Sequence, residues 1–314
     1  MKAIKLFFLA AIVIAALFSG CNRPDNGYPL VVAHRGVSSL APENTLAAVK
    51  KAVEIGADGS EIDVRLTKDG EVVLLHDSRL KRTAGDPGAV WDFTLQELTG
   101  FEVGAWFGEK FEGEPIPTLT QVIRSVKGKI LLNIEIKLSR EEPEIAQKVV
   151  DIIHREKIRK KCLITSFDRK TVETVKEIDP RIKTGFIFGQ DYPEDVFEGN
   201  WDVLSCNIRV LNAEFMAKAR EKKKEIHVWT VDDQEEMRRL IDLGVDAIIT
   251  NRPQDLIPLV RKSRQSQIFP ARLSRLGKTA GRHKEAFEHE RNIRAISDFV
   301  FNRGMRESIG NYRF

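Results

Sequence analysis

The sequence predicts an α/β fold: a (β/α)8 TIM barrel with an insertion after strand 2. Between residues 30 and 260, short apolar runs rich in β-branched residues alternate with segments of helical periodicity. Eight such strand–helix units occupy about 230 residues, which is the size and rhythm of this barrel. A doubly wound sheet is the alternative, but no glycine-rich phosphate loop follows the first strand.

The first unit combines a buried strand with a capped helix. Residues 30–34 form a short apolar run, which Arg35-Gly36 ends. Asn44 or Thr45 begins a helix that reaches Ile55, because these residue types cap helix N-termini and Gly56 follows the last apolar residue.

A hairpin over residues 60–77 supplies the second strand. It alternates apolar and polar residues, turns at Lys68-Asp69-Gly70 and returns with the same alternation. If Leu66 pairs with Glu71, His76 returns beside Glu61; another turn type would shift this register by one residue. The two readings of this segment alone are a charged surface hairpin and a functional site.

An insertion and a regular series of units follow the hairpin. Residues 79–117 contain glycines, prolines and six aromatics without a long period, which is typical of a loop that walls a pocket. Helices are expected at 119–126, 143–156, 170–178, near Glu194, 213–223 and 235–243, and strands at 130–137, 162–167, 183–188, 203–208, 226–231 and 246–250.

The amino-terminal residues 1–21 predict an export signal. Two lysines precede an apolar run from Leu6 to Phe18, which is too short to span a bilayer. Small residues before Cys21 predict a lipoprotein signal with lipidation at Cys21, and residues 22–29 would be a tether. A cleaved soluble export signal and an uncleaved anchor are the alternatives. The expected location is therefore the periplasm or cell envelope.

Charge is distributed unevenly between the predicted domain at 30–260 and the extension at 261–314. The extension contains thirteen Lys/Arg and five Asp/Glu, so the first 260 residues carry a net charge of −4 within a total of +4. The acidic body gives no sign of nucleic-acid binding. The extension is either a basic amphipathic helix on an anionic membrane or a solvated tail.

Two cysteines remain in the predicted domain. Cys162 opens one strand and Cys206 closes another, which places them at opposite ends of a parallel barrel. We therefore expect two buried free thiols instead of a disulfide.

Charged residues on neighbouring strands predict a metal site. Glu61 and Asp63 are two positions apart on the second strand, and Glu135 lies on the third. Buried charges need partners or a metal, and three carboxylates suit Ca²⁺ or Mg²⁺ better than zinc. For each acid alone, a salt bridge such as Glu135 with Lys137 is the simpler interpretation.

Two histidines predict acid–base catalysis beside this metal. His34 ends the first strand and His76 the hairpin, and histidines exchange protons near neutral pH. Arg35 and Lys137 add fixed positive charge. A divalent metal, two histidines and cations together suit a phosphodiester, whose negative charge must be neutralised.

At these residues the chain resembles the glycerophosphodiester phosphodiesterase family, in bacterial and exported form. The matching motifs run in family order from residue 30 to about residue 259. They are V-A-H-R-G (Val32 to Gly36), P-E-N-T (Pro42 to Thr45), E-I-D-V (Glu61 to Val64), T-K-D-G (Thr67 to Gly70), H-D (His76-Asp77), P-T-L (Pro117 to Leu119), N-I-E-I-K (Asn133 to Lys137) and V-W-T-V (Val228 to Val231).

The resemblance implies hydrolysis of glycerophosphodiesters to an alcohol and glycerol 3-phosphate. It also implies which residues form the site. The metal ligands would be Glu61, Asp63 and Glu135, the acid–base pair would be His34 and His76, and the phosphate ligands would be Arg35 and Lys137, with Glu43 nearby. Trp229 either packs on the substrate or belongs to the core. The alternatives are a related phospholipase D-type barrel acting on lysophospholipids, and a non-catalytic surface-binding lipoprotein.

Overall fold

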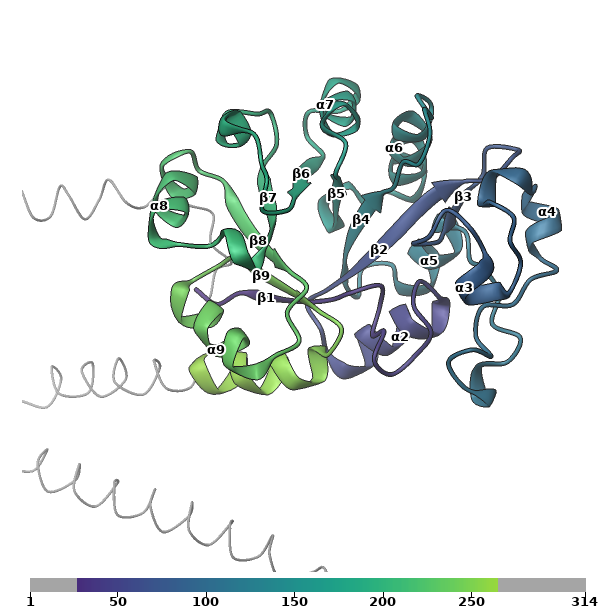
Figure 1. The fold of residues 1–314 in the computed structure, drawn as a ribbon, viewed down its shortest axis with the longest axis horizontal. Coiled ribbons are helices and arrows are strands. Elements are labelled where there is room, and N and C mark those ends of the chain that lie inside the picture. Colours follow the sequence, from purple (N-terminus) through teal and green to yellow (C-terminus); the bar gives the residue numbers. More distant parts are fainter. Residues whose placement is uncertain (1–26, 265–314) are drawn as a thin grey trace, which may run out of the picture. The chain divides into compact units, whose positions relative to one another are not determined.

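The computed structural model describes residues 27–264, and eight parallel strands in this range close into a barrel. The pairing of β1 with β2 closes the ring, so the predicted (β/α)8 barrel is confirmed (Figure 1). Around the barrel the strands follow the order β1 (Leu30–Ala33), β9 (Ala247–Thr250), β8 (Glu225–Trp229), β7 (Val203–Asn207), β6 (Lys183–Phe188), β5 (Cys162–Ser166), β4 (Leu131–Ile136) and β2 (Gly59–Leu66).

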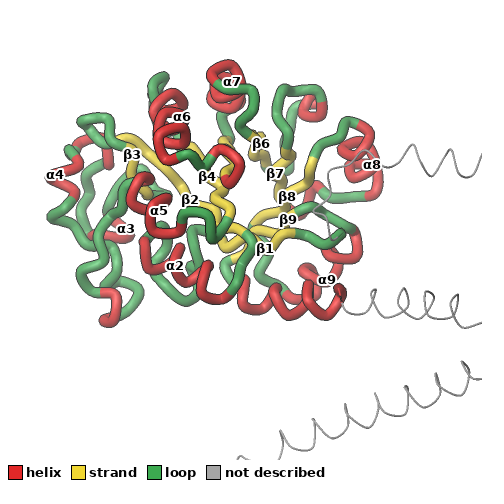
Figure 2. Tube along the Cα trace, turned by 180° about the vertical axis from the view of Figure 1, so that it is seen from behind, coloured by secondary structure: helices red, strands yellow, loops and turns green. Residues whose placement is uncertain are grey.

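Amphipathic helices surround the strands (Figure 2). In α5 the apolar residues Leu119, Val122, Ile123 and Val126 recur at helical spacing and are fully buried. The bounds are α2 (Leu46–Ile55), α5 (Leu119–Val126), α6 (Ile145–Glu156), α7 (Arg169–Ile178), the 3-10 helix η4 (Glu194–Phe197), α8 (Ala213–Glu221), α9 (Gln234–Leu243) and a last helix over 253–264.

The predicted caps of α2 are present. The Thr45 hydroxyl accepts a hydrogen bond from the Ala48 N–H, and Gly56 ends the helix with φ of 78°, in the left-handed region that favours glycine. In the described part of the chain, no helix has both the length and the apolar character needed to cross a membrane. The predicted signal, Cys21 and the extension beyond residue 264 lie outside the described residues.

The register of the hairpin differs by one residue from the predicted pairing of Leu66 with Glu71. Leu66 pairs with Val72 and Val64 with Leu74, and β3 (Val72–Leu74) ends before His76. A five-residue turn causes the shift, because the Thr67 N–H donates to the Glu71 carbonyl and the Thr67 hydroxyl accepts from the Glu71 N–H. His76 therefore lies in the loop that follows the strand and not within it.

The insertion forms a small lobe of its own beside β3 (Figure 1). Its short helices are α3 (Lys81–Ala84), η1 (Val90–Asp92), α4 (Leu95–Leu98) and η2 (Glu109–Phe111). They cover a separate apolar cluster that includes Val73 and Leu75 from the end of the hairpin. The insertion thereby fixes the segment that carries His76.

The interior of the barrel is hollow at both ends. Side chains from alternate strand positions line a cavity of about 220 Å³ at the carboxyl ends of the strands. Another cavity, of about 420 Å³, is lined by residues that begin the strands, including Leu30, Gly59 and Lys183. Asn133, in the middle of β4, borders both. The barrel thus offers two separate interior sites.

Both cysteines are buried and free, as expected. Cys162 begins β5 and Cys206 is near the end of β7. Burial raises the pKa of each thiol to about 12, so both stay protonated at neutral pH.

Candidate active site

Three buried carboxylates meet at the carboxyl end of the barrel. Strand register places Asp63 on β2 beside Glu135 on β4, and Glu61 lies one strand repeat below on the same face. One oxygen from each of the three lies within 4.8 Å of the other two. The two-residue spacing and parallel pairing predicted from the sequence therefore bring all three expected metal ligands together.

The electrostatics of this cluster favour an added cation. Burial, reinforced by Asp63 and Glu135, raises the pKa of Glu61 well above its ordinary value. Burial and Asp63 raise the pKa of Glu135 to about 7. Glu61 Oε1 is buried without a hydrogen-bond partner among the described residues. Oxygen atoms with these properties fit a hard divalent cation.

Asp63 remains ionised at the centre of the cluster. Although burial opposes ionisation, Lys137 and Arg35 hold its pKa below the ordinary value. Lys137 Nζ lies 3.5 Å from Asp63 and 2.9 Å from Glu135. Asn44 also holds Asp63, donating from Nδ2 to the carboxylate at 2.8 Å and accepting from its backbone N–H. The carboxylate is therefore fixed from three directions.

His34, just after β1, is held by an amide whose orientation is fixed. Its Nδ1 lies 2.7 Å from Asn251 Oδ1, while Asn251 Nδ2 donates to Asp232. Because a carboxylate only accepts, Asn251 must present its oxygen to His34. Nδ1 then carries the proton, and Nε2 is left free beside Glu61 at 3.9 Å. Burial and Arg35 hold the pKa of His34 below 6.5.

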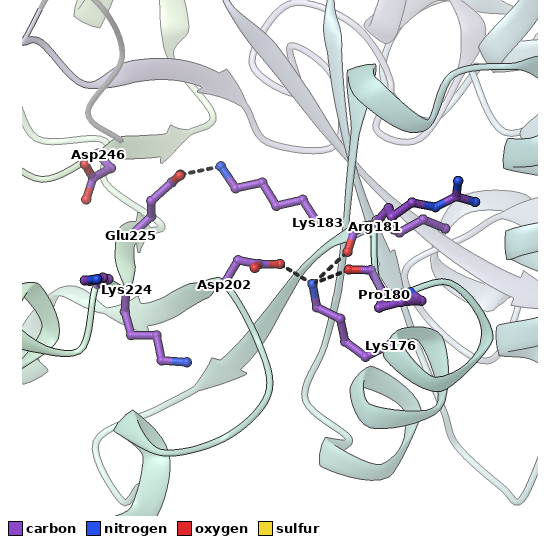
Figure 3. Close-up of a pocket in the computed structure, with 10 residues that line it drawn as sticks. Lys176, Pro180, Arg181, Lys183, Asp202, Lys224, Glu225 and Asp246 are labelled. Atoms are coloured by element: carbon purple, nitrogen blue, oxygen red, sulfur yellow. Dashed lines mark hydrogen bonds and ion pairs between the residues drawn. The ribbon is translucent and has the colours of Figure 1, made fainter. Parts of the chain in front are cut away.

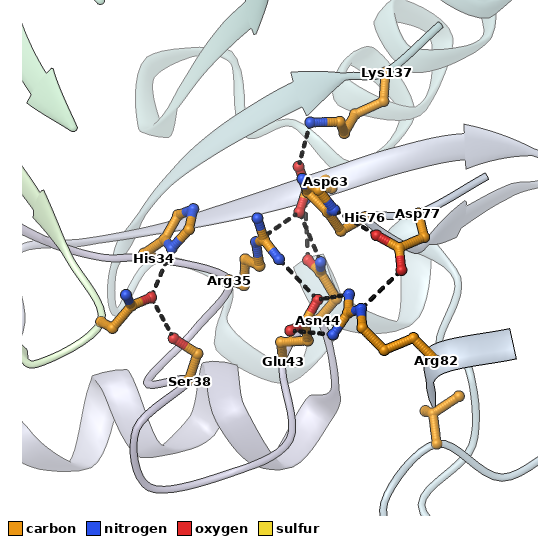
Figure 4. A network of polar contacts seen from close by, with 12 residues as sticks. His34, Arg35, Ser38, Glu43, Asn44, Asp63, His76, Asp77, Arg82 and Lys137 are labelled. Atoms are coloured by element: carbon orange, nitrogen blue, oxygen red, sulfur yellow. Dashed lines mark hydrogen bonds and ion pairs between the residues drawn. The ribbon is translucent and has the colours of Figure 1, made fainter. Parts of the chain in front are cut away.

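His76 is held by a carboxylate instead. Its Nδ1 lies 2.8 Å from Asp77 Oδ1, and Arg82 Nε donates to the other Asp77 oxygen at 2.7 Å (Figure 4). Burial lowers the pKa of His76, while Asp63 and Asp77 act in the opposite direction. Asp77 therefore stabilises the protonated ring of His76 more than Asn251 stabilises the protonated ring of His34.

Arg82, from the insertion, connects the two sides of the site. Its Nη atoms donate to both Glu43 oxygens at 2.9 and 2.7 Å, and Glu43 also accepts from Arg35 at 2.9 Å. The chain of ion pairs thus runs from His76 through Asp77 to Arg35, which lies 3.5 Å from Asp63 (Figure 4). Glu43, expected near the site, serves as the link between two arginines.

Aromatic side chains form the opposite wall of the cavity. Trp229 donates from Nε1 to the Ser205 carbonyl and packs edge to face with Phe167 at 5.6 Å. Lys137 Nζ lies 5.7 Å from the Phe167 ring, whose residue is 50% exposed. Trp229 therefore lines the cavity and also packs against neighbouring residues of the barrel, and its contact with substrate stays a prediction.

The structure adds residues that the sequence reasoning did not assign to the site. Asn251 directly follows β9. His34 was identified because site residues of this barrel lie at the carboxyl ends of strands, and the same principle identifies Asn251. Arg82 gave no comparable signal, since its segment has no periodicity and only its packing brings it to Asp77. The full set of additional residues is Asn44, Asp77, Arg82, Phe167, Asp232 and Asn251.

Comparisons with known proteins match most of the barrel. Residues 34–255 match the model of the glycerophosphoryl diester phosphodiesterase family. A glycerophosphodiester phosphodiesterase of Caldanaerobacter subterraneus subsp. tengcongensis is 41% identical over 238 residues, covering 74% of this chain and 98% of that protein. Another, from Bacillus subtilis, is 28% identical, covering 82% of this chain and 94% of that protein.

A solved structure resembles the fold closely. It is a phosphodiesterase of Oleispira antarctica in complex with the product sn-glycerol-3-phosphate. It aligns with a TM-score of 0.71 and 28% identity, covering 74% of this chain and 97% of that chain.

Proposed function

The chain belongs to the glycerophosphoryl diester phosphodiesterase family and is a glycerophosphodiester phosphodiesterase; we propose that it cleaves its substrates into an alcohol and glycerol 3-phosphate with a divalent metal and two histidines. One observation carries this proposal. Two members of the buried carboxylate cluster, Glu61 and Glu135, line the same cavity as His34 and His76. The two histidines differ in the group that holds Nδ1, which is an amide for His34 and a carboxylate for His76. The proposal assigns a role to each group.

Glu61, Asp63 and Glu135 hold the ion, Ca²⁺ or Mg²⁺. The unpartnered Glu61 Oε1 and the raised pKa values of Glu61 and Glu135 support this assignment. When bound, the ion neutralises charge on the phosphoryl oxygens. Arg35 and Lys137, which lie beside the carboxylate cluster, would bind phosphate oxygens.

His34 is the general base of the first step. Its Nδ1 proton points to Asn251, so Nε2 is free to accept a proton. The pKa of His34 lies below 6.5, so the ring is neutral at pH 7. It takes the proton from a glycerol hydroxyl of the substrate, whose oxygen attacks phosphorus to form a cyclic phosphate.

His76 is the general acid. Asp77 stabilises its protonated ring through Nδ1, which leaves the Nε2 proton for the leaving oxygen as the P–O bond to the alcohol breaks. Water then opens the cyclic phosphate: His76 takes a proton from water, and His34 returns one to the glycerol oxygen. Both histidines thereby regain their starting states. Trp229 and Phe167 pack against the organic part of the substrate.

Two substrates separate the roles of the histidines. Glycerophosphocholine has a poor leaving group that needs an acid, whereas a glycerophosphoryl p-nitrophenyl ester has a leaving group that does not. We expect His76→Ala to lose about 10²–10⁴-fold in kcat on the first substrate and far less on the second, and His34→Ala to lose heavily on both. His154→Gln, a half-exposed histidine outside the cavity, is the matched control.

Equal losses on both substrates in both variants would contradict the separate roles. Full activity of either variant on glycerophosphocholine would remove that histidine from the mechanism. Turnover of lysophosphatidylcholine in preference to glycerophosphocholine would instead favour the phospholipase D-type alternative. Absence of turnover by the wild type on both would favour a non-catalytic binding role.

We also propose that the protein is exported and attached to the cell envelope through Cys21, with residues 30–260 as the catalytic domain. The support is the sequence alone: an apolar run from Leu6 to Phe18 and small residues before Cys21. For the basic extension at 261–314, an anionic membrane surface and a solvated tail remain the two alternatives.

A further inference from the structure

The cavity at the amino end of the barrel is built from the first residues of several strands. Its volume of about 420 Å³ lies within the range of small-molecule sites. Its large apolar side chains come from three strands: Leu30 and Val32 of β1, Leu131 and Leu132 of β4, and Leu163 of β5. Asn133 separates it from the catalytic cavity, so a ligand here would not touch the carboxylate cluster.

Four cations border this apolar cavity, and two of them have no side-chain partner among the described residues. Arg181 pairs with Asp179 and Lys183 with Glu225. The side chains of Arg159 and Lys160 make no ion pair or hydrogen bond within residues 27–264. Arg159 is half-buried, and its backbone carbonyl accepts from the thiol of Cys162, the first residue of β5, at 3.6 Å. A half-buried free guanidinium favours an anionic partner.

His227 supplies a polar group inside the cavity. The residue is 4% exposed, and neither ring nitrogen has a hydrogen-bond partner among the described residues. Its Nε2 lies 3.6 Å from the Glu225 carboxylate, which is an ion-pair distance when the ring is protonated. Nδ1 has no partner of either kind among the described residues. Buried polar atoms are nearly always hydrogen-bonded, so this nitrogen indicates a ligand or water that donates to it or accepts from it.

In a neighbouring charged pocket, by contrast, four charged side chains pair with one another. Lys176, Asp202, Lys183 and Glu225 line it, and Figure 3 shows these residues joined in pairs. Lys224 donates to two backbone carbonyls. The charges of these five residues are satisfied within the described part of the chain, whereas those of Arg159 and Lys160 at the apolar cavity are not.

We propose that this amino-end cavity binds a single-chain amphiphile with an anionic head group. The acyl or alkyl chain covers the leucines, and the head pairs with Arg159 and Lys160 at the rim. His227 hydrogen-bonds a polar atom of the ligand. A carboxylate and a phosphate monoester share the required head-group chemistry. The inference is independent of the catalytic roles assigned above.

The test measures binding of four probes to the full chain by calorimetry below their micelle concentrations. The probes are decanoate, decyl phosphate, decanol and inorganic phosphate. We expect at least one of the two amphiphilic anions to bind, and both decanol and inorganic phosphate to bind at least tenfold more weakly. The preferred anion then identifies the head group as carboxylate or phosphate.

Variants locate the site. Arg159→Gln should weaken binding about tenfold, because a charge-assisted contact is lost. Arg238→Gln, which removes an exposed arginine from α9, should leave affinity unchanged. Leu30→Trp enlarges a side chain that lines the cavity and should also weaken binding. Arg159→Gln and Leu30→Trp should both keep wild-type kcat, which shows that they fold.

Histidine NMR provides a readout that does not depend on any variant. The ring resonances of His227 should shift when the anion binds, while those of His34 and His76 should not. No binding of either anion, equal binding of decanol, equal binding of inorganic phosphate, or unchanged affinity in Arg159→Gln would each overturn the proposal. Shifts confined to His34 and His76 would place the anion in the catalytic cavity and overturn it as well.

Discussion

The two ends of this barrel contain the same kinds of residue in different balance. Each end has a His–Asp–Arg chain: His76, Asp77 and Arg82 at the carboxyl end, and His154, Asp179 and Arg181 at the amino end. At the amino end the chain lies on the surface, with the His154 side chain 45% exposed. At the carboxyl end it borders a cavity and contacts a cluster of buried charge.

The two ends differ in how completely their carboxylates are paired with cations. At the amino end, Asp179, Asp202 and Glu225 each have a cation within ion-pair distance. At the carboxyl end three acids share two cations, and one oxygen of Glu61 has no hydrogen bond within the described residues. A charged cluster therefore indicates catalysis when its charges are incompletely balanced, and the number of charges alone does not distinguish the ends.

The largest expected effect is stabilisation of the fold by a bound metal ion. It should depend on the carboxyl end of the barrel and not on the amino end. At a concentration 100 times the Kd, Ca²⁺ or Mg²⁺ should stabilise the wild type by about 2.7 kcal/mol, raising Tm by roughly 5–10 °C. Glu61→Gln should abolish this shift, as measured by calorimetry. Without metal the same variant should be at least as stable as the wild type, because Glu61 is an unfavourably buried acid.

The matched control is Glu225→Gln at the amino end. It loses the ion pair with Lys183 and should be slightly less stable, yet it should keep the full metal-induced shift. A metal shift that survives in Glu61→Gln, or one lost in Glu225→Gln, would move the metal site away from the carboxyl end. Activity after prolonged chelation is the complementary measurement.

A smaller effect distinguishes the two His–Asp–Arg chains. Arg82→Gln removes the arginine that holds Asp77 and Glu43, so His76 loses its orientation. We expect kcat to fall about tenfold with little change in KM, since Arg82 acts through Asp77 and does not contact the substrate cavity. Arg82→Lys should restore only part of the loss, because a lysine cannot reproduce the paired contacts.

Arg181→Gln makes the corresponding change at the amino end. It should lower stability slightly and leave kcat unchanged, because Asp179 and His154 do not face the catalytic cavity. Equal kinetic losses in the two arginine variants would mean that Arg82 contributes only to folding.

The sequence predicted those features that follow from local pattern. Strand β6 and helix α5 have the predicted bounds, and other elements differ by one to three residues at their ends. The carboxylates and His34 were found because parallel strands bring their carboxyl ends together. The hairpin register depended on the Thr67 hydroxyl, which shapes the turn through contacts that alternation does not encode.

Residues placed by packing were beyond the reach of the sequence. Arg82 reaches Glu43 from 39 positions away, and only the apolar cluster under the insertion brings it there. His227 resembled any polar residue in a strand, because nothing in the pattern showed that its ring would be buried without a partner. Such residues depend on contacts between distant segments, and these contacts exist only in the folded chain.

The smallest expected effect is a dependence of stability on pH, which tests how strongly Asp77 is paired with Arg82 and His76. Although burial acts against it, hydrogen bonds from Arg82 and His76 lower the pKa of Asp77 to about 2, against an ordinary value of 3.8. A depressed carboxyl pKa stabilises the folded state above the unfolded value and loses that contribution as pH falls through the folded one. Asp77→Asn should therefore be less stable than the wild type at pH 6, by about 0.5–1 kcal/mol for a partly exposed pair. Denaturant unfolding of both proteins should show this gap closing between about pH 4 and pH 2; a gap that stays constant over this range would show that Asp77 is not held by its charge.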